Sequence, residues 1–233
     1  MSGPDESQPE TPDASGLTLD AVQENEELQL FIASADKVME GMGFTEHGFR
    51  HAMLTAKIAF NVIDRLERDP HEANLAAVSG YLHDVGNMAT REAHPQVGGV
   101  LVYNALRGEV PGADLAQIVA AIANHEEPEG YSVSPIAAAV ILADKSDVHR
   151  SRVRKAENVG FDIHDRVNYA AEQSFLRVDS AAKTITLELT IDTEISQVME
   201  YFEIFLDRMT MCRRAAETLD CAFKLNINGA DLL

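Results

Sequence analysis

The stretch Leu75–Gly86, LAAVSGYLHDVG, decides what kind of fold this chain adopts. Its apolar residues recur at intervals of three and four, which is the spacing of a helix with one buried face. The polar pair His83-Asp84 stands at the end of that face, shortly before the glycine. An imidazole and a carboxylate in a core are costly unless they hydrogen-bond or bind a cation. The stretch therefore predicts a buried helix whose C-terminal end carries chemistry.

The helical spacing continues on both sides of this stretch, from Leu17 to about Ala171. Helix-starting signals stand before several segments, as at His94-Pro95 and Ser134-Pro135, where a capping residue precedes a proline. This part of the chain predicts a mainly α-helical bundle. The expected helices cover residues 18–41, 46–68, 71–85, 94–106, 113–125, 134–149 and 162–173.

Beyond residue 173 the apolar spacing changes to the alternation of a β-strand. Apolar and polar residues alternate over 185–191, and residues 175–178 can pair with them across a turn at 179–183. A long helical pattern over 194–219 and a further alternating segment at 223–227 follow. These patterns predict a small C-terminal antiparallel β-sheet packed on a long helix.

The chain thus divides into three parts. Residues 1–16 are acidic and almost free of apolar side chains, so we expect a disordered leader. Residues 17–173 form the helical domain and residues 174–233 a C-terminal subdomain. The apolar side chains of this subdomain pack on the helical domain or on a second subunit, so a homodimer is one arrangement that we consider.

Composition limits the partners of the protein. The 233 residues include 19 basic and 38 acidic side chains, so the formal net charge of −19 opposes bulk binding to nucleic acid or to an anionic membrane. Cys212 and Cys221 lie nearly half a helical turn out of phase, which argues against a disulfide. The first thirty residues resemble no secretion signal, and the longest apolar run, residues 136–143, is too short for a membrane span. We therefore expect a soluble cytoplasmic protein.

Five of the eight histidines lie beside apolar residues or at expected helix ends, together with two aspartates. His47 and His51 share an inward stripe with Leu54 and Ile58, and Asp144 lies one turn after Val140 on another. A bound cation satisfies buried imidazoles and carboxylates together. Nitrogen and oxygen ligands without thiolate favour iron, manganese, cobalt or zinc over calcium or a soft metal. The side chains concerned are His47, His51, His83, Asp84, His94, His125 and Asp144.

The order of these residues resembles that of the HD-domain metal-dependent phosphohydrolase superfamily. The motifs are similar to those of its HD-GYP-like branch and extend from residue 46 to about 154. They are His83-Asp84-Val85-Gly86, His94-Pro95-Gln96-Val97-Gly98, Asn124-His125-Glu126 and Ala143-Asp144, preceded by His51.

The resemblance implies an all-α HD-domain helical bundle with a binuclear metal centre. The first ion would be held by His51, His83, Asp84 and Asp144, and Asp84 would bridge to a second ion held by His94 and His125. The two divalent ions would be iron or manganese, with cobalt, zinc or magnesium as further candidates.

The activity implied is hydrolysis of a phosphomonoester or phosphodiester of a nucleotide or small metabolite. Two cations would lower the pKa of a bridging water and stabilise charge on the phosphoryl oxygens. The catalytic residues would be His83, Asp84 and Lys145. Two alternatives stay open: a di-iron oxygenase with the same ligand set, and a non-catalytic sensor that binds a metal or nucleotide.

The chain also departs from the HD-GYP pattern. Asn87 stands where those enzymes have a lysine, Asn124-His125 where they have paired histidines, and Ser132 follows Gly130-Tyr131. These differences argue against cyclic dinucleotides as substrates. His47 replaces a glutamate of some relatives, so a third metal or an altered first site stays open.

Basic residues gather directly after Asp144, where five of the 19 lie within eleven positions, from Lys145 to Lys155. Arginine forks match phosphate oxygens, so this cluster predicts phosphate binding, with a solvated helix end as the alternative. The substrate-contact candidates are His47, Asn87, Asn124, Lys145, Arg150, Arg152 and Arg154. Asn87, Asn124, Glu126 and Asp147 are candidates to accept the second N–H of the ligating imidazoles.

Overall fold

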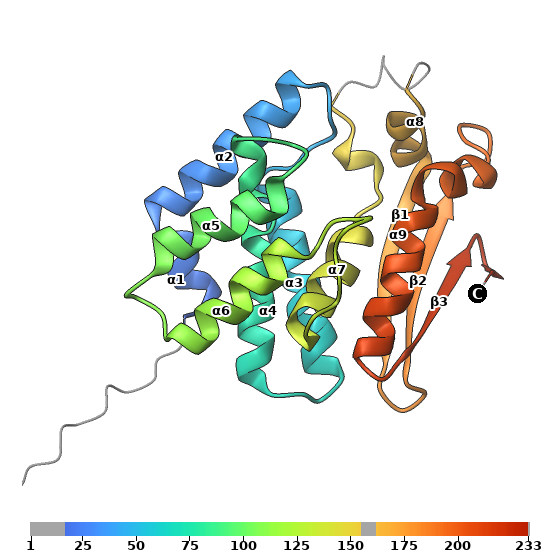
Figure 1. Cartoon of the computed structure of the whole chain (residues 1–233). Coiled ribbons are helices and arrows are strands. Elements are labelled where there is room, and N and C mark those ends of the chain that lie inside the picture. Colours follow the sequence, from blue (N-terminus) through green and yellow to red (C-terminus); the bar gives the residue numbers. More distant parts are fainter. Residues whose placement is uncertain (1–16, 155–161, 233) are drawn as a thin grey trace, which may run out of the picture.

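A computed structural model of the chain describes residues 17–154 and 162–232 (Figure 1). The leader expected at residues 1–16 and the basic residue Lys155 lie outside the described residues. The helical elements are α1 (Leu19–Glu24), α2 (Glu26–Gly41), α3 (Phe49–Arg65), α4 (Pro70–Leu82), η1 (Val85–Met88), α5 (His94–Leu106), α6 (Gly112–Ala123), α7 (Pro135–Lys145), η2 (Arg150–Arg152), α8 (Ile163–Ala170) and α9 (Val198–Thr218). The strands are β1 (Ala171–Asp179), β2 (Thr184–Ile191), β3 (Ala222–Ile227) and β4 (Ala230–Asp231).

The mainly helical architecture with a small C-terminal sheet confirms the predicted fold class (Figure 1). Helix α5 begins and ends at the predicted residues. The segment expected as one helix over 18–41 is divided at Asn25. The backbone of Asn25 is extended, and its side chain accepts a hydrogen bond from the Leu28 amide, so it caps a new helix.

Helices α3, α4 and α7 pack at the centre of the helical part. Every residue of α7 from Ile136 to Lys145 is buried, because α3, α4, α6 and α9 surround this helix. A Cβ atom at Gly80 of α4 would lie 3.1 Å from the backbone of Thr55 in α3, so the two backbones approach closely. The buried face of α3 accordingly consists largely of small side chains such as Ala56 and Ala59.

The start of α3 differs from the prediction. The expected helix over 46–68 placed His47 on a stripe with His51, Leu54 and Ile58, but α3 begins at Phe49 after the N-cap Gly48. His47 lies outside the helix because the carboxylate of Asp36 accepts a hydrogen bond from its backbone amide, at 2.9 Å. Leu54 and Ile58 are only partly buried. His51 and the small residues of α3 form the inward face instead.

The C-terminal sheet is mixed, whereas the sequence predicted an antiparallel one. Strand order is β1-β2-β3-β4; β1 pairs with β2 and β3 with β4 antiparallel, but β2 and β3 are parallel. The reason is the connection: α9 carries the chain back along the sheet before β3, as a parallel pair requires. One sheet face is buried, through Ile185 and Leu187 of β2 and Leu225 of β3, while the other face is polar.

Helix α9 connects the sheet to the helical bundle, because it contacts α7 as well as β2 and β3 (Figure 1). Its buried residues include Tyr201, Phe205 and Cys212. Buried apolar residues of the helices and of the sheet form one continuous core. Among the residues that the structure describes, no helix has the length and apolar character needed to cross a membrane.

The turn after α4 allows one close backbone approach that brings α5 beside the His83-Asp84 pair. A Cβ atom at Gly86 would lie 1.9 Å from the carbonyl oxygen of His94 and 2.6 Å from the amide nitrogen of Gly98. Both neighbours are backbone atoms, so they cannot move aside without shifting α5. Glycine is therefore required at this position by packing alone.

We predict that Gly86→Ala lowers the free energy of unfolding by about 1–3 kcal/mol or more, because overpacking forces the backbone apart. Urea denaturation measures this loss. Gly41→Ala is the matched control, since Gly41 lies in α2 with no other atom within 4 Å of its added Cβ. Equal stability of the two variants would contradict the close approach.

Candidate metal centre

Six side chains from separate elements converge at the ends of the central helices. His51 comes from α3, and His94 is the first residue of α5. Their polar atoms fall into groups whose members all lie within 4.8 Å of one another, and every residue of these groups is buried. The groups are His51, His83 and Asp84; His83, His125 and Asp144; and Asp84, His94 and His125. The six residues that the sequence predicted as metal ligands are therefore brought together.

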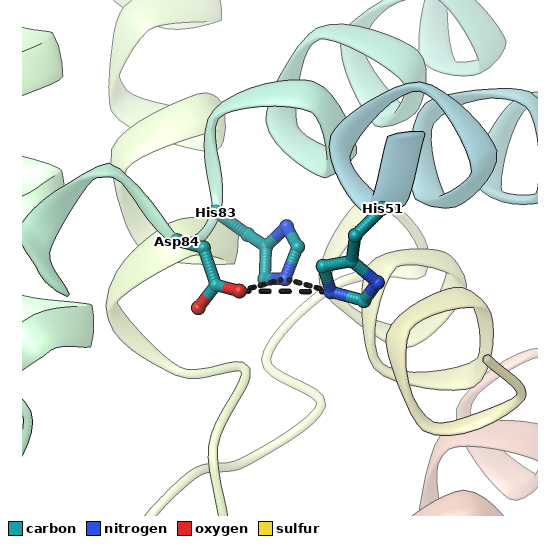
Figure 2. Close-up of side chains that lie close together, drawn as sticks. All are labelled: His51, His83 and Asp84. Atoms are coloured by element: carbon teal, nitrogen blue, oxygen red, sulfur yellow. Dashed lines mark hydrogen bonds and ion pairs between the residues drawn. The ribbon is translucent and has the colours of Figure 1, made fainter. Parts of the chain in front are cut away.

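Asp84 occupies the middle of this group, and its two oxygens face different histidine pairs. Oδ2 lies 3.2 Å from Nε2 of His83 and 3.6 Å from Nε2 of His51. Figure 2 draws these contacts as dashed lines between the three side chains. Oδ1 lies 3.4 Å from Nε2 of His94 and 3.9 Å from Nε2 of His125. One carboxylate can thus serve two neighbouring ions.

The two sides of Asp84 form two candidate metal sites, and Asp144 adds a further carboxylate to the first of them, beside His51 and His83. Its Oδ1 lies 3.3 Å from Nε2 of His51 and 3.7 Å from Nε2 of His83. The first site therefore offers two imidazole nitrogens and two carboxylate oxygens. The second site offers the other oxygen of Asp84 with two imidazole nitrogens, from His94 and His125.

The hydrogen bonds of the other ring nitrogens fix the tautomer of these histidines. Nδ1 of His83 lies 2.8 Å from the carbonyl oxygen of Gly80, and Nδ1 of His94 lies 2.7 Å from that of Arg91. His125 makes the same contact with Ile122, at 2.7 Å. A carbonyl oxygen only accepts, so each Nδ1 carries a proton and each Nε2 faces the cluster.

The Nε2 atoms of the four imidazoles face one another in pairs at short range. Nε2 of His51 lies 3.2 Å from Nε2 of His83, and Nε2 of His94 lies 3.2 Å from Nε2 of His125. Burial lowers the pKa values of His94 and His125, so both rings are neutral acceptors that do not attract each other at this distance, whereas a cation shared between them satisfies both. The donor set therefore fits divalent ions that accept nitrogen ligands.

The imidazole of His51 differs from the other three, because a carboxylate, that of Asp147, lies behind it instead of a backbone oxygen. The carboxylate of Asp147 lies 2.7 Å from Nδ1 of His51 and 2.8 Å from a guanidinium nitrogen of Arg50. Burial alone would raise the pKa of Asp147, but its hydrogen bond with His51 and the charge of Arg152 hold that pKa far below its usual value. An ionised carboxylate behind a ligating imidazole orients the ring and strengthens it as a ligand.

Electrostatics keep the two ligand carboxylates ionised. Burial would raise the pKa values of Asp84 and Asp144, but neighbouring His83 and Lys145, respectively, hold both well below the usual range. Burial lowers the pKa of His83, yet Asp84 and Asp144 together raise it to about 10. Burial lowers the pKa of His125 to about 3. The cluster thus holds negative charge that attracts a proton or a metal cation.

A second buried polar group lies behind Asp144, and we call it the Lys145 cluster. Nζ of Lys145 lies 2.8 Å from Oδ2 of Asp144 and 2.7 Å from Glu127, and it also donates to Glu126. Burial would lower the pKa of Lys145, but these three carboxylates raise it far above its usual value. Its members are Arg91, Glu126, Glu127, Asp144, Lys145 and Arg208.

The Lys145 cluster balances its own charge. Arg91 lies 2.6 Å from Glu126, and Arg208 lies 2.9 Å from Glu127. Three basic groups thus match three acidic ones, so the two glutamates add no net negative charge beside the histidines. Lys145, predicted as catalytic and substrate-binding, contacts the predicted ligand Asp144 directly, and its catalytic role stays a prediction.

A cleft of about 390 Å³ adjoins the metal cluster. It contacts the cluster through Arg91, which lies 3.2 Å from Nε2 of His94, and through Glu126. His47 lines it as well, and the His47 and His51 rings are 5.7 Å apart. The other lining residues are Met42, Gly43, Phe44, Thr45, Glu127, Arg152, Asp162, His164, Asp165, Asn168, Ile204, Phe205 and Arg208.

The two predicted asparagines take different positions. Nδ2 of Asn87 donates to Oδ1 of Asp84 at 2.8 Å and to its backbone oxygen at 3.1 Å, so Asn87 orients the central carboxylate. Asn124 donates to the backbone oxygen of Ala120 in its own helix, at 2.9 Å. Neither lines the cleft within the described part of the chain, and their predicted contacts with substrate stay untested.

The arginines after α7 make contacts with the protein itself. Arg150 pairs with Glu172 at 3.0 Å, and Arg154 pairs with Asp36. Buried Arg152 donates to the backbone oxygen of Glu46 at 2.9 Å and lines the cleft. These contacts hold residues 150–154 against helix α2, the loop before α3 and strand β1. Phosphate binding by Arg150, Arg152 and Arg154 stays a prediction.

Sequence reasoning did not single out three residues of this region. Arg91, Glu127 and Arg208 join the Lys145 cluster and line the cleft. Arg208 had a visible signal, because it interrupts the helical stripe of Phe205 and Cys212 with a cation. The other two lie in turns, where periodicity carries no information.

Residues 48–150 match the HD domain family. The match covers α3 to α7 and all six residues of the metal cluster, and it supports placement of this region in the HD superfamily, whose members are generally metal-dependent hydrolases. No curated protein matches the chain.

We predict that removal of divalent ions with a chelator lowers Tm, because a ligand that binds only the folded state stabilises it by about 2.7 kcal/mol at a hundred times its Kd. Scanning calorimetry with metal analysis measures the change. Mn²⁺ or Fe²⁺ should restore Tm, and Ca²⁺ serves as the control because it prefers oxygen ligands. A Tm that is unaffected by chelator and by every added ion would contradict a metal centre.

We predict that Asp147→Asn weakens metal binding about 10–100-fold, because the imidazole of His51 loses its ionised partner. A competition titration with a metal-sensitive dye measures the affinity. Asp114→Asn is the matched control, since Asp114 also accepts from a histidine, His71, at 2.9 Å but lies apart from the cluster. Equal affinities for the two variants would show that Asp147 does not support His51.

Proposed function

We propose that the protein is a metal-dependent phosphohydrolase that cleaves a phosphomonoester or phosphodiester of a nucleotide or other small metabolite. The observation that carries this proposal is the position of Asp84, whose two oxygens face two separate imidazole pairs. Paired ions a few ångströms apart suit an in-line displacement at phosphorus. The HD domain match supports the same reaction class in its general form.

The ligands divide between two ions as follows. His51, His83 and Asp144 would hold the first ion together with Oδ2 of Asp84. His94 and His125 would hold the second with Oδ1 of Asp84. Bound divalent ions supply Lewis acidity, which lowers the pKa of water and offsets charge on phosphoryl oxygens. Iron and manganese agree best with this mixture of nitrogen and oxygen ligands.

Neighbouring side chains orient the proposed metal ligands. Asn87 fixes the orientation of Asp84 by donating to its Oδ1 at 2.8 Å, and Asp147 fixes that of His51. Both partners are buried, so neither needs to reorganise when substrate arrives. Lys145 neutralises Oδ2 of Asp144 and leaves Oδ1 to face the histidines.

The adjoining cleft fits a small phosphorylated molecule. Its volume of about 390 Å³ is within the range of small-molecule sites. Phe44 and Phe205 give it apolar walls, while His47 and Arg91 line the part near the metal cluster. The organic part of the substrate would pack on the aromatic walls, with its phosphate toward the histidines.

Bound metal ions would supply the positive charge that an anionic ligand needs at this location. The chain as a whole carries −19, which repels phosphates at a distance. The cleft is lined by three arginines, Arg91, Arg152 and Arg208, and by the four carboxylates of Glu126, Glu127, Asp162 and Asp165. Local cations in a low-dielectric cleft bind a phosphate strongly over a few ångströms.

We predict that Asp84→Ala loses bound metal and phosphatase activity together, because both ions share its carboxylate. The measurements are elemental analysis of metal-loaded protein and turnover of an aryl phosphate and a nucleotide panel. The loss of activity should exceed a hundredfold, the scale of several kcal/mol of transition-state stabilisation.

Asp64→Ala is the control for this experiment, since Asp64 is exposed on α3 away from the metal cluster. Circular dichroism establishes that both variants are folded. Full turnover and stoichiometric metal in Asp84→Ala would refute the proposal. A metal-loaded native protein that cleaves no phosphate ester in the panel would also refute it.

A further inference from the structure

Helix α9 supplies one wall of the cleft, although it lies outside the segment that matches the HD domain. Ile204, Phe205 and Arg208 come from this helix, while His47, Arg91 and Glu126 come from the matched region or its border. The cleft is therefore built jointly by the two parts of the chain. Figure 1 shows α9 beside α7, the helix that carries Asp144.

Arg208 is held in a fixed orientation on this wall. Its Nε donates to Oε1 of Glu127 at 2.9 Å. Its guanidinium carbon lies 4.5 Å from the centre of the Phe205 ring, within the range of a cation–π contact. Two contacts of different kinds thus orient one planar group, so little side-chain freedom remains to be lost when a ligand binds.

The terminal nitrogens of Arg208 remain available. Within the described residues neither Nη atom forms a hydrogen bond, since Nε makes the contact with Glu127. The other two arginines of the cleft are engaged: Arg91 contacts Asn87, His94 and Glu126. Arg152 donates to backbone oxygens of Glu46 and Asp147. Among the described cleft residues, Arg208 is thus the guanidinium with a free pair of donors.

Arg208 also lies within electrostatic range of the metal ligands. Burial would lower its pKa, but the negative charges of Glu127, Glu126 and Asp144 raise it. Two ion-paired side chains, Glu127 and Lys145, link Arg208 to Asp144, which would hold the first proposed ion. A phosphate that contacted both Arg208 and this ion would meet positive charge on two sides.

We propose that Arg208 binds the phosphate of the substrate through its two terminal nitrogens, and that α9 thereby completes the active site. This inference rests on the proposed function of the cleft. The forked geometry of two parallel N–H donors matches two oxygens of one phosphate. The C-terminal helix then contributes directly to substrate binding as well as to the core.

The test is calorimetric titration of inorganic phosphate into Mn²⁺-loaded protein. We expect Arg208→Gln to weaken phosphate binding at least about tenfold, which is the effect of losing a hydrogen-bonded charge. Arg208→Lys keeps the charge without the fork and should give an intermediate Kd. Arg213→Gln is the matched control, because Arg213 is an exposed arginine of the same helix outside the cleft. It should bind phosphate as the native protein does.

Metal content of every variant is measured alongside, and it should not change. Native affinity for phosphate in Arg208→Gln would overturn the inference. Loss of metal from that variant would also overturn it, because Arg208 would then act on Asp144 through the Lys145 cluster. The inference would also be overturned if the native metal-loaded protein failed to bind phosphate.

Turnover of phosphate esters by the native protein is measured separately. Phosphate binding that depends on Arg208, without any hydrolysis, would support the inference and refute the proposed function. Hydrolysis that is unaffected in kcat/KM by Arg208→Gln would support the function and refute the inference. The two ideas can thus fail independently.

Discussion

The structure depends on one electrostatic constraint: the Nε2 atoms of four imidazoles face one another in pairs on either side of the buried carboxylate of Asp84. Backbone oxygens accept hydrogen bonds from Nδ1 of His83, His94 and His125, so the Nε2 atom of each ring faces the cluster. Nitrogen pairs at 3.2 Å and a central carboxylate form a stable arrangement when cations lie between them. Much of the helical bundle serves to hold these groups in place.

The fold meets this constraint with helix ends. His83 and Asp84 directly follow α4, His94 begins α5, and His125 follows α6, so the ligands leave their helices where backbone carbonyls are still free to accept. The close approach at Gly86 fixes α5 beside Asp84, and the contact at Gly80 does the same for α3 and α4. Small residues at helix contacts therefore determine the spacing of the metal ligands.

The sequence predicted the ligands because imidazoles and carboxylates on the buried face of a helix are stable there only when they hydrogen-bond or bind a cation. It misplaced His47, since a hydrogen bond from its amide to Asp36, eleven residues away, sets the start of α3. The parallel pairing of β2 and β3 was equally hidden, because alternation of apolar residues carries no strand direction. Arg208 belongs to the cleft only through the packing of α9, which spacing along the chain does not reveal.

The most direct test of this account is anomalous X-ray scattering from crystals grown with Mn²⁺. We expect two peaks on opposite sides of the Asp84 carboxylate, one among His51, His83 and Asp144 and the other between His94 and His125. A single peak elsewhere, or none despite saturating metal, would contradict the account.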